Sequence, residues 1–182
     1  DFVKAPAGSW MSLLDQGYLK QRAALIDTSE QPKSMNTAKA GQPQALQAAY
    51  ASMPHQKEYG TSHISIVDKY GNALAMTTTI ESQFGSKLMV NRGKGLAGGF
   101  LLNNEMTDFS FTPRDEAGKP VANRVEPNKR PRSSMSPTLV YEKLPNGKRG
   151  KLLMSLGSPG GANIIHYTAK TLYASLNWGL NA

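Results

Sequence analysis

Between Thr61 and Ile80 the pattern of apolar residues changes to a period of two, which is typical of half-buried β-strands. The segment HISIVDKYGNALAMTTTI contains two runs rich in β-branched residues on either side of a Tyr-Gly-Asn turn at 70–72. This arrangement predicts an antiparallel hairpin. A turn centred on Tyr70 pairs Thr61 with Thr79, and a turn centred just after it pairs Thr61 with Ile80. In both cases Thr61 and Thr79 are near neighbours.

A second hairpin and a helix are predicted further along the chain. Residues 137–143 and 151–156 are strand-like runs joined by a Pro-Asn-Gly turn. After them, a glycine-rich turn opens a helix, and Gly179 lies where a left-handed C-terminal cap would stop it. The residues that recur at helical spacing in it are Ile165, Thr168, Leu172 and Leu176. Hairpins combined with helices indicate an α+β fold.

The first sixty residues have a different character. A stripe at helical spacing predicts one helix, and its members are Met11, Leu14, Tyr18, Ala23 and Leu25. Residues 29–43 are rich in Ser, Pro, Gly, Thr and Asn, which predicts a linker. We therefore divide the chain into segments 1–60 and 61–182.

Composition excludes several classes of protein. The 182 residues include no cysteine, which excludes disulfide scaffolds, Cys-bearing zinc sites, iron–sulfur sites and thiol nucleophiles. Any covalent catalyst must therefore be a hydroxyl, a lysine or a carboxylate. The formal net charge of +8 permits a nucleic-acid partner. The basic residues are scattered, with their densest cluster at 128–132, so a solvated basic surface is the favoured interpretation.

The ends and apolar runs of the sequence also carry information. No run approaches the ~20 apolar residues of a membrane-spanning helix. The opening DFVKAPAGSW contains neither the apolar region of a secretory signal nor an initiator Met. We therefore expect the chain to begin inside a longer gene product.

A glycine precedes a hydroxyl residue at the start of the first predicted strand, in EYGTSHISIVD. N-terminal nucleophile hydrolases cleave their precursors at such a bond, and the freed α-amine then serves as the base. An α-amine titrates near ~8, so a useful fraction is unprotonated at neutral pH. The dipeptide Gly60-Thr61 is common, however, and a threonine that merely begins a strand is the alternative explanation.

The segment LGSPGGANII brings a predicted strand through glycines into a helix. Without Cβ atoms, Gly160 and Gly161 allow their backbone N–H groups to approach a ligand closely, as in an oxyanion hole. A tight strand-to-helix turn explains the same pattern. The spacing matches neither nucleotide-binding glycine motif, so nucleotide binding is not supported.

Three acids could form a pocket for a cation. Glu105 and Asp108 lie three residues apart in NNEMTDF, and Glu81 follows the strand that carries Thr79. Converging acids would bind an ammonium group, whereas scattered surface acids would bind nothing. The three histidines lack metal-ligand spacing, and His63 is expected to pack or hydrogen-bond locally on its strand, so no metal site is predicted.

Taken together, these segments resemble the γ-glutamyltranspeptidase family of N-terminal nucleophile hydrolases. The motifs that carry the resemblance occur in family order: TSHISIVDKYGNALAMTTTIESQFGS, LLNNEMTDFS, PNKRPRSSMSPT and LGSPGG. The resemblance extends from DFVKAP to the helix ending NWGLN, which is nearly the whole chain.

The resemblance implies an αββα sandwich, a precursor cut between Gly60 and Thr61, and Thr61 as the nucleophile. Thr79 matches the family threonine that hydrogen-bonds the nucleophile. The other matched positions are Gly160 and Gly161 as oxyanion donors, Ser133 and Ser134 as binders of the substrate α-carboxylate, and Glu81, Glu105 and Asp108 as binders of its α-ammonium.

The implied activity is hydrolysis or transfer of γ-glutamyl groups from glutathione and related amides, without cofactor or metal. Water or an amino acid would accept the acyl group. By resemblance, residues 1–60 end the large subunit and residues 61–182 begin the small catalytic subunit. The remainder of both subunits would be its partners, and a periplasmic or extracellular location is expected. No nucleic acid or membrane span is expected.

Departures from the family pattern leave alternatives open. The family's carboxylate-binding arginine lies upstream of the region that this chain matches, so the chain resembles a fragment and is expected to be inactive alone. An aromatic lid residue is not evident within 112–131, as in cephalosporin-acylase-like members. A cephalosporin or glutaryl acylase is therefore the close alternative, although a glutaryl group has no ammonium for three acids to bind. A non-enzymatic basic binding module is the more distant alternative.

Overall fold

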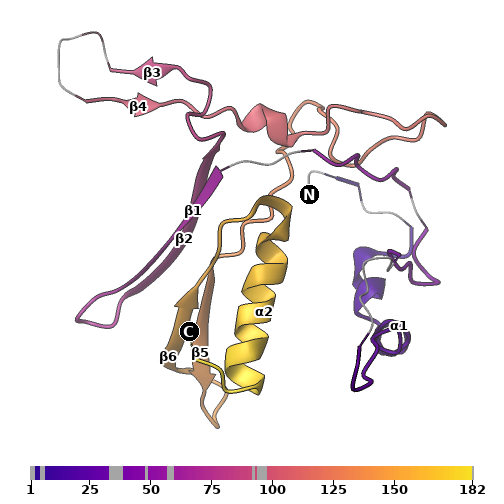
Figure 1. Cartoon of the computed structure of the whole chain (residues 1–182), viewed down its shortest axis with the longest axis vertical. Helices are drawn as coiled ribbons and strands as arrows, with labels where there is room; N and C mark the ends of the chain where they lie inside the picture. The colour runs from indigo at the N-terminus through magenta and orange to yellow at the C-terminus, as the bar shows by residue number, and fades with distance from the viewer. Residues whose placement is uncertain are drawn as a thin grey trace. The chain divides into compact units, whose positions relative to one another are not determined.

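The computed structural model describes residues 3–4, 7–32, 39–47, 49–56, 60–91, 93 and 98–181. The described residues form helices and two-stranded antiparallel sheets, which confirms the α+β prediction (Figure 1). The chain folds as two compact units, one formed by residues 1–54 and 110–130 and the other by residues 55–109 and 131–182. The division at residue 60 concerns precursor cleavage and stays a prediction.

In the first unit, the single helix predicted between Met11 and Leu25 is wrong. A 3-10 helix η1 (Trp10–Leu14) is followed by helix α1 (Gln16–Ala23), with Asp15 between them. Asp15 adopts an extended conformation, and its side chain accepts a hydrogen bond of 2.8 Å from the backbone N–H of Tyr18. An aspartate that caps a new helix in this way ends the preceding one. Of the predicted linker, residues 33–38 lie outside the described residues and the rest is irregular.

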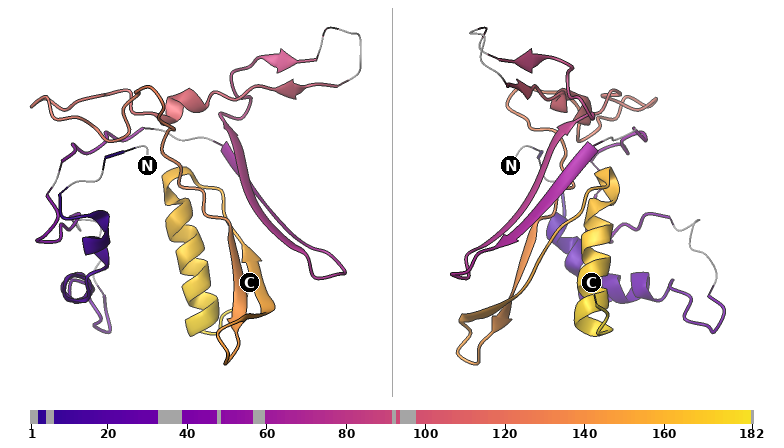
Figure 2. Two further views of the ribbon diagram at one scale, coloured as in Figure 1. Left: turned by 180° about the vertical axis from the view of Figure 1, so that it is seen from behind. Right: turned by 60° about the vertical axis from the view of Figure 1, so that its left-hand side comes forward.

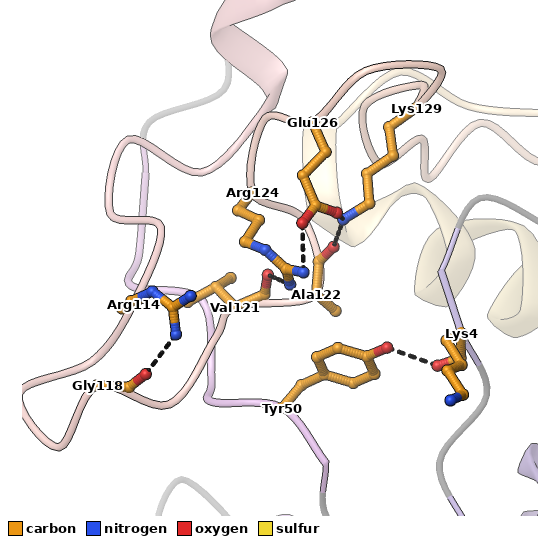
Figure 3. Close-up of polar contacts among 9 residues, drawn as sticks. All are labelled: Lys4, Tyr50, Arg114, Gly118, Val121, Ala122, Arg124, Glu126 and Lys129. Atoms are coloured by element: carbon orange, nitrogen blue, oxygen red, sulfur yellow. Dashed lines mark hydrogen bonds and ion pairs between the residues drawn. The ribbon is translucent and has the colours of Figure 1, made fainter.

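Loop segments complete the first unit. Leu46 and Val121 are its buried apolar residues in the described part of the chain, and Ala51 pairs with Val121 in an isolated parallel bridge. Figure 3 shows the polar contacts of this region, including the hydrogen bond of 2.6 Å from the Tyr50 hydroxyl to the Lys4 carbonyl. This bond joins two residues that are 46 positions apart in the sequence through a backbone acceptor.

In the second unit, strands β1 (Gly60–Val67) and β2 (Ala73–Glu81) form the predicted hairpin. Asp68 organises its turn, because the Asp68 carboxylate accepts hydrogen bonds from the backbone N–H groups of Tyr70 (2.8 Å) and Asn72 (2.9 Å). The pairing of Ser62 with Thr78 confirms the register that a turn centred on Tyr70 predicts. The register shifts between Gly60 and Ser62, so Thr61 lies at a β-bulge.

Beyond β2 the chain makes a short excursion and returns. Strands β3 (Met89–Val90) and β4 (Phe100–Leu101) pair antiparallel, and the 3-10 helix η2 (Glu105–Asp108) follows. Figure 1 shows this excursion beyond the ends of β1 and β2. The return is closed by hydrogen bonds from the N–H of Ser86 to the Leu102 carbonyl (2.8 Å) and from the N–H of Asn104 to the Ile80 carbonyl (3.2 Å). The end of β2 is thereby brought next to η2.

The second predicted hairpin is also confirmed, as strands β5 (Thr138–Lys143) and β6 (Arg149–Leu156). The 3-10 helix η3 (Gly161–Asn163) leads into helix α2 (Ile164–Asn177), which runs alongside this hairpin (Figure 2). Gly179 follows α2 at a positive φ of 66°, as predicted for the residue that stops the helix. Ile164 is buried at the start of α2.

Candidate active site

The Gly60–Thr61 bond lies at the first two positions of β1, where the hairpin ladder is irregular. The Thr79 hydroxyl donates a hydrogen bond to the Gly60 carbonyl and accepts one of 2.8 Å from the backbone N–H of Glu81. Thr61 and Thr79 are both half-buried. The Thr79 hydroxyl therefore contacts the carbonyl group of the predicted cleavage site. Residues 57–59, just before this site, lie outside the described residues.

His63, two positions beyond Thr61, is held by its own hairpin. One ring nitrogen, Nδ1, lies 2.8 Å from Thr77 Oγ1 and the other, Nε2, lies 3.0 Å from Ser65 Oγ. Of the two local roles predicted for His63, packing or hydrogen bonding, the structure shows hydrogen bonds, one to its own strand β1 and one to the paired strand β2. The ring also fills the space beside Gly157, where any Cβ atom would overlap it. Sequence reasoning missed Gly157, whose only signal is a glycine directly after a predicted strand.

Glu81 ends β2 as a buried carboxylate with a side chain that is 5% exposed. Its Oε2 atom accepts hydrogen bonds from Ser82 Oγ (2.6 Å) and from Asn104 Nδ2. Its backbone has a positive φ of 70°, which is uncommon for a residue other than glycine. Neither Glu81 nor Glu105 forms an ion pair with a residue that the structure describes.

The three predicted acids lie close enough to influence one another. Burial raises the pKa of Glu105 from 4.5 to about 7, assisted by a hydrogen bond with Asp108 and by the negative charges of Asp108 and Glu81. Glu105 Oε1 is buried without a hydrogen-bond partner in the described part of the chain. The excursion through β3 and β4 therefore assembles an acidic cluster, defined here as Glu81, Glu105 and Asp108.

The predicted oxyanion glycines adopt backbone conformations suited to glycine. Gly160 has a φ of 136° and Gly161 a φ of 54°. A Cβ atom at Gly160 would also overlap the ring of Tyr167, so both the backbone angle and the lack of space favour glycine at this position. Neither backbone N–H donates a hydrogen bond to another described residue.

Ser133 and Ser134 lie in the irregular segment before β5. Ser133 Oγ accepts a hydrogen bond of 3.3 Å from the backbone N–H of Met135, and the Ser134 carbonyl accepts one of 3.0 Å from Ser136 Oγ. Within the described residues no hydrogen bond joins either serine to the acidic cluster. Their predicted role toward a substrate carboxylate stays a prediction.

Lys129, a member of the basic cluster at 128–132, makes contacts within the protein (Figure 3). Glu126 forms ion pairs with Arg124 (2.5 Å) and Lys129 (2.6 Å), and Lys129 also donates to the Ala122 carbonyl at 3.1 Å. The hydrogen bond from Lys129, followed by that from Arg124, holds the pKa of Glu126 below its ordinary value. The Lys129 side chain is only 9% exposed. It is therefore poorly placed to contact a nucleic acid.

Metal-binding clusters are absent from the described residues, where no group of three or more His, Asp or Glu side chains is arranged to hold a metal ion. Within the same residues, no helix combines the length and apolar character needed to cross a bilayer.

Comparison with known proteins assigns the chain to a protein family. The sequence profile of the family described as gamma-glutamyltranspeptidase matches residues 1–182. The chain belongs to the γ-glutamyltranspeptidase family.

The chain is similar to the "Glutathione hydrolase proenzyme" of Bacillus subtilis (strain 168), with 37% identity over 186 residues. That alignment covers 99% of this chain and 28% of the relative. The proenzyme of the same name from Escherichia coli (strain K12) is 39% identical over 189 residues, which cover 100% of this chain and 28% of the relative. The chain therefore spans less than a third of the length of these relatives.

Among solved structures, the chain resembles the γ-glutamyltranspeptidase from Pseudomonas nitroreducens in complex with L-DON. The TM-score is 0.51 at 39% identity, over 65% of this chain and 58% of that chain. The likeness in structure agrees with the family assignment from sequence.

Proposed function

We propose that this chain is part of a γ-glutamyl hydrolase or transferase that acts through a covalent Thr61 acyl-enzyme. The observation that carries the proposal is the Thr79 hydroxyl on the Gly60 carbonyl, at the bulged bond before a half-buried threonine. The names of the relatives, which are glutathione hydrolases, support the same activity. The neighbouring acidic cluster supports a substrate that carries an ammonium group.

In the proposed maturation, Thr61 Oγ attacks the carbonyl carbon of Gly60 and the C–N bond breaks. The hydroxyl proton passes to the leaving nitrogen, and an ester joins Gly60 to Thr61. Water hydrolyses this ester to a Gly60 carboxylate and a free Thr61 α-amine. Thr79 donates to the oxygen on which negative charge develops, and one such donor typically stabilises a transition state by ~2.7–4 kcal/mol.

In the proposed reaction, Thr61 Oγ attacks the γ-amide carbonyl of the substrate and its α-amine takes up the hydroxyl proton. That proton then passes to the leaving amine. The N–H groups of Gly160 and Gly161 would stabilise the oxyanion, since neither donates to an acceptor among the described residues. Water or an amino-acid amine finally attacks the γ-glutamyl ester and regenerates Thr61.

The substrate head is proposed to be zwitterionic. The acidic cluster would bind its α-ammonium, and the hydroxyls of Ser133 and Ser134 would bind its α-carboxylate. A glutaryl acylase needs no such cluster, because a glutaryl group has no ammonium. The ion pairs of Glu126 with Arg124 and Lys129 likewise weigh against a basic binding module.

The complete αββα sandwich, the cleaved large and small subunits and a periplasmic or extracellular location belong to the same proposal. The α+β architecture and the likeness to a solved γ-glutamyltranspeptidase support the sandwich. The location rests on family resemblance alone.

The experiment uses the full-length precursor that contains this chain. Thr61→Ala should remain one chain and lack γ-glutamyl anilide hydrolysis, because it removes the attacking hydroxyl. Ser62→Ala is the matched control, since Ser62 is the exposed neighbour and should mature normally. Intact mass after incubation and the release of the aniline give the readouts. A fragment beginning at residue 61 in the Thr61→Ala protein would contradict the proposal.

A further inference from the structure

Asn104 occupies the N-cap position of η2, yet its side chain does not cap that helix. Asparagine at this position ordinarily accepts a hydrogen bond from a backbone N–H of the first turn. Here its Oδ1 atom instead accepts a hydrogen bond of 3.0 Å from the N–H of Ser82, and its Nδ2 atom donates to Glu81 Oε2. The Nδ2 atom also lies 3.0 Å from Ser82 Oγ and, more distantly, 3.3 Å from Thr107 Oγ1 of η2. The side chain therefore bonds mainly to the end of β2 and links it to η2.

The orientation of this amide is determined by its partners. The backbone N–H of Ser82 can only donate, so the Asn104 oxygen must face it, and the amide nitrogen then faces the Glu81 carboxylate. The backbone of Asn104 is held as well, because its N–H donates to the Ile80 carbonyl and its own carbonyl accepts from Thr107 Oγ1 at 2.9 Å. A half-buried amide held at both ends has little freedom to turn away.

Glu81 depends on these donors. A buried carboxylate needs hydrogen bonds, and the two donors on Glu81 Oε2 are the neutral groups Ser82 Oγ and Asn104 Nδ2. They fix the direction of the carboxylate without neutralising its charge. Neither neutral donor offsets the negative charge of Glu81, which therefore adds to the charge of the acidic cluster.

We propose that Asn104 is a positioning residue that holds the Glu81 carboxylate within the acidic cluster and thereby sets the affinity for the substrate ammonium. The inference rests on the proposed function. Glu105 and Asp108 lie on η2, which Asn104 begins, so one side chain ties the end of β2 to the helix that carries the other two acids. Without the amide donor, the Glu81 carboxylate can turn away from the other two acids of the cluster, Glu105 and Asp108.

The first test is Asn104→Asp in the full-length protein, which keeps the shape, removes the donor and adds a like charge beside Glu81. The KM for a γ-glutamyl anilide should rise about 10- to 100-fold with kcat within about threefold, as for the loss of a hydrogen bond to a charged group. Cleavage before Thr61 should proceed. Asn146→Asp, the same change in the exposed β5–β6 turn, should leave KM unchanged.

A double-mutant cycle tests whether Asn104 acts through Glu81, and it uses Asn104→Ala, which adds no charge. Asn104→Ala should raise KM in the protein with Glu81 and have little further effect in the Glu81→Gln background. Additive effects, or a wild-type KM in both Asn104 variants, would overturn the proposal even if hydrolysis depends on Thr61. Hydrolysis that survives Thr61→Ala would instead overturn the proposed function, and this inference with it.

Discussion

Glu105 has the most perturbed ionisation of the candidate site. Burial, the hydrogen bond with Asp108 and the nearby charges of Asp108 and Glu81 raise its pKa from 4.5 to about 7. Each of these causes disfavours a further negative charge in a cluster that already contains two other carboxyl groups. Glu105 therefore holds a proton in neutral to weakly acidic solution and releases it as the pH rises through about 7.

This ionisation predicts a pH dependence of ligand binding. An ammonium ligand favours the ionised cluster, so affinity should fall as the pH falls through about 7, by about tenfold if binding lowers the pKa of Glu105 by one unit. The measurement is the dissociation constant of L-glutamate for the mature full-length enzyme between about pH 6 and pH 8. In a free amino acid the adjacent carboxylate favours the charged form of the α-ammonium, so this group stays charged over that range, unlike the α-amine of a peptide chain.

Glu105→Gln is the corresponding variant. It should bind L-glutamate more weakly at the upper end of this range and show no step near neutral pH, because the titrating group is gone. A step of unchanged size in Glu105→Gln would assign the titration to another group. Ser133 and Ser134 do not titrate in this range, so their role in carboxylate binding should not produce such a step.

At the level of elements, the two long hairpins of the second unit touch through small residues. Ser155 on β6 donates to the Leu74 carbonyl on β2 at 3.0 Å, and its hydroxyl lies 3.1 Å from Ser65 Oγ on β1. Directly after β6, Gly157 lies against the His63 ring. The glycine loop that contains Gly160 and Gly161 is thereby connected to β1, the strand whose second residue is the candidate nucleophile.

This contact predicts that Gly157→Ala is destabilising. The new Cβ overlaps the His63 ring, which its hydrogen bonds to Thr77 and Ser65 hold in place. Overpacking of this kind typically costs about 1–3 kcal/mol of unfolding free energy. Denaturant unfolding of the full-length protein measures it, and kcat should fall because the oxyanion glycines shift relative to Thr61.

His63→Ala provides the control for that prediction. Removing the ring makes room for the new methyl group, so the double variant should be less destabilised than the sum of the two single variants. Strict additivity would show that the two residues do not interact and that Gly157 is required for another reason.

At the level of the whole molecule, this chain buries little apolar surface. In the described residues the buried apolar side chains are Leu46, Phe109, Val121 and Ile164, whereas thirty large apolar side chains are exposed. Its sheets have two strands each, and such hairpins are marginally stable in water. The chain also spans 28% of its glutathione hydrolase relatives.

We therefore predict that the 182-residue chain, expressed alone, does not turn over γ-glutamyl substrates. Exposed apolar side chains and unpaired strand edges should make it bind hydrophobic dyes and aggregate. Dye fluorescence, light scattering and γ-glutamyl anilide hydrolysis are the measurements, with the full-length protein as the positive control. Hydrolysis by the isolated chain that Thr61→Ala abolishes would contradict this prediction.

The sequence alone determined those elements whose signals lie within a short segment of the chain. The β1–β2 and β5–β6 hairpins, the register that brings Thr61 near Thr79 and the stop of α2 at Gly179 follow from alternation, turn residues and capping within short segments. The predicted single helix failed for a similarly local reason, because the apolar stripe concealed the cap at Asp15.

Only the tertiary structure decided which distant groups meet. Glu81 and Asn104 are brought together by the return through β3 and β4, and no periodicity of the chain encodes that closure. The fit of Gly157 against His63 and the Thr79 hydroxyl on the Gly60 carbonyl depend in the same way on the packing of hairpins and on a bulge. Local backbone preferences specify strands and turns, whereas the positions of polar side chains in a site depend on long-range packing and hydrogen bonding.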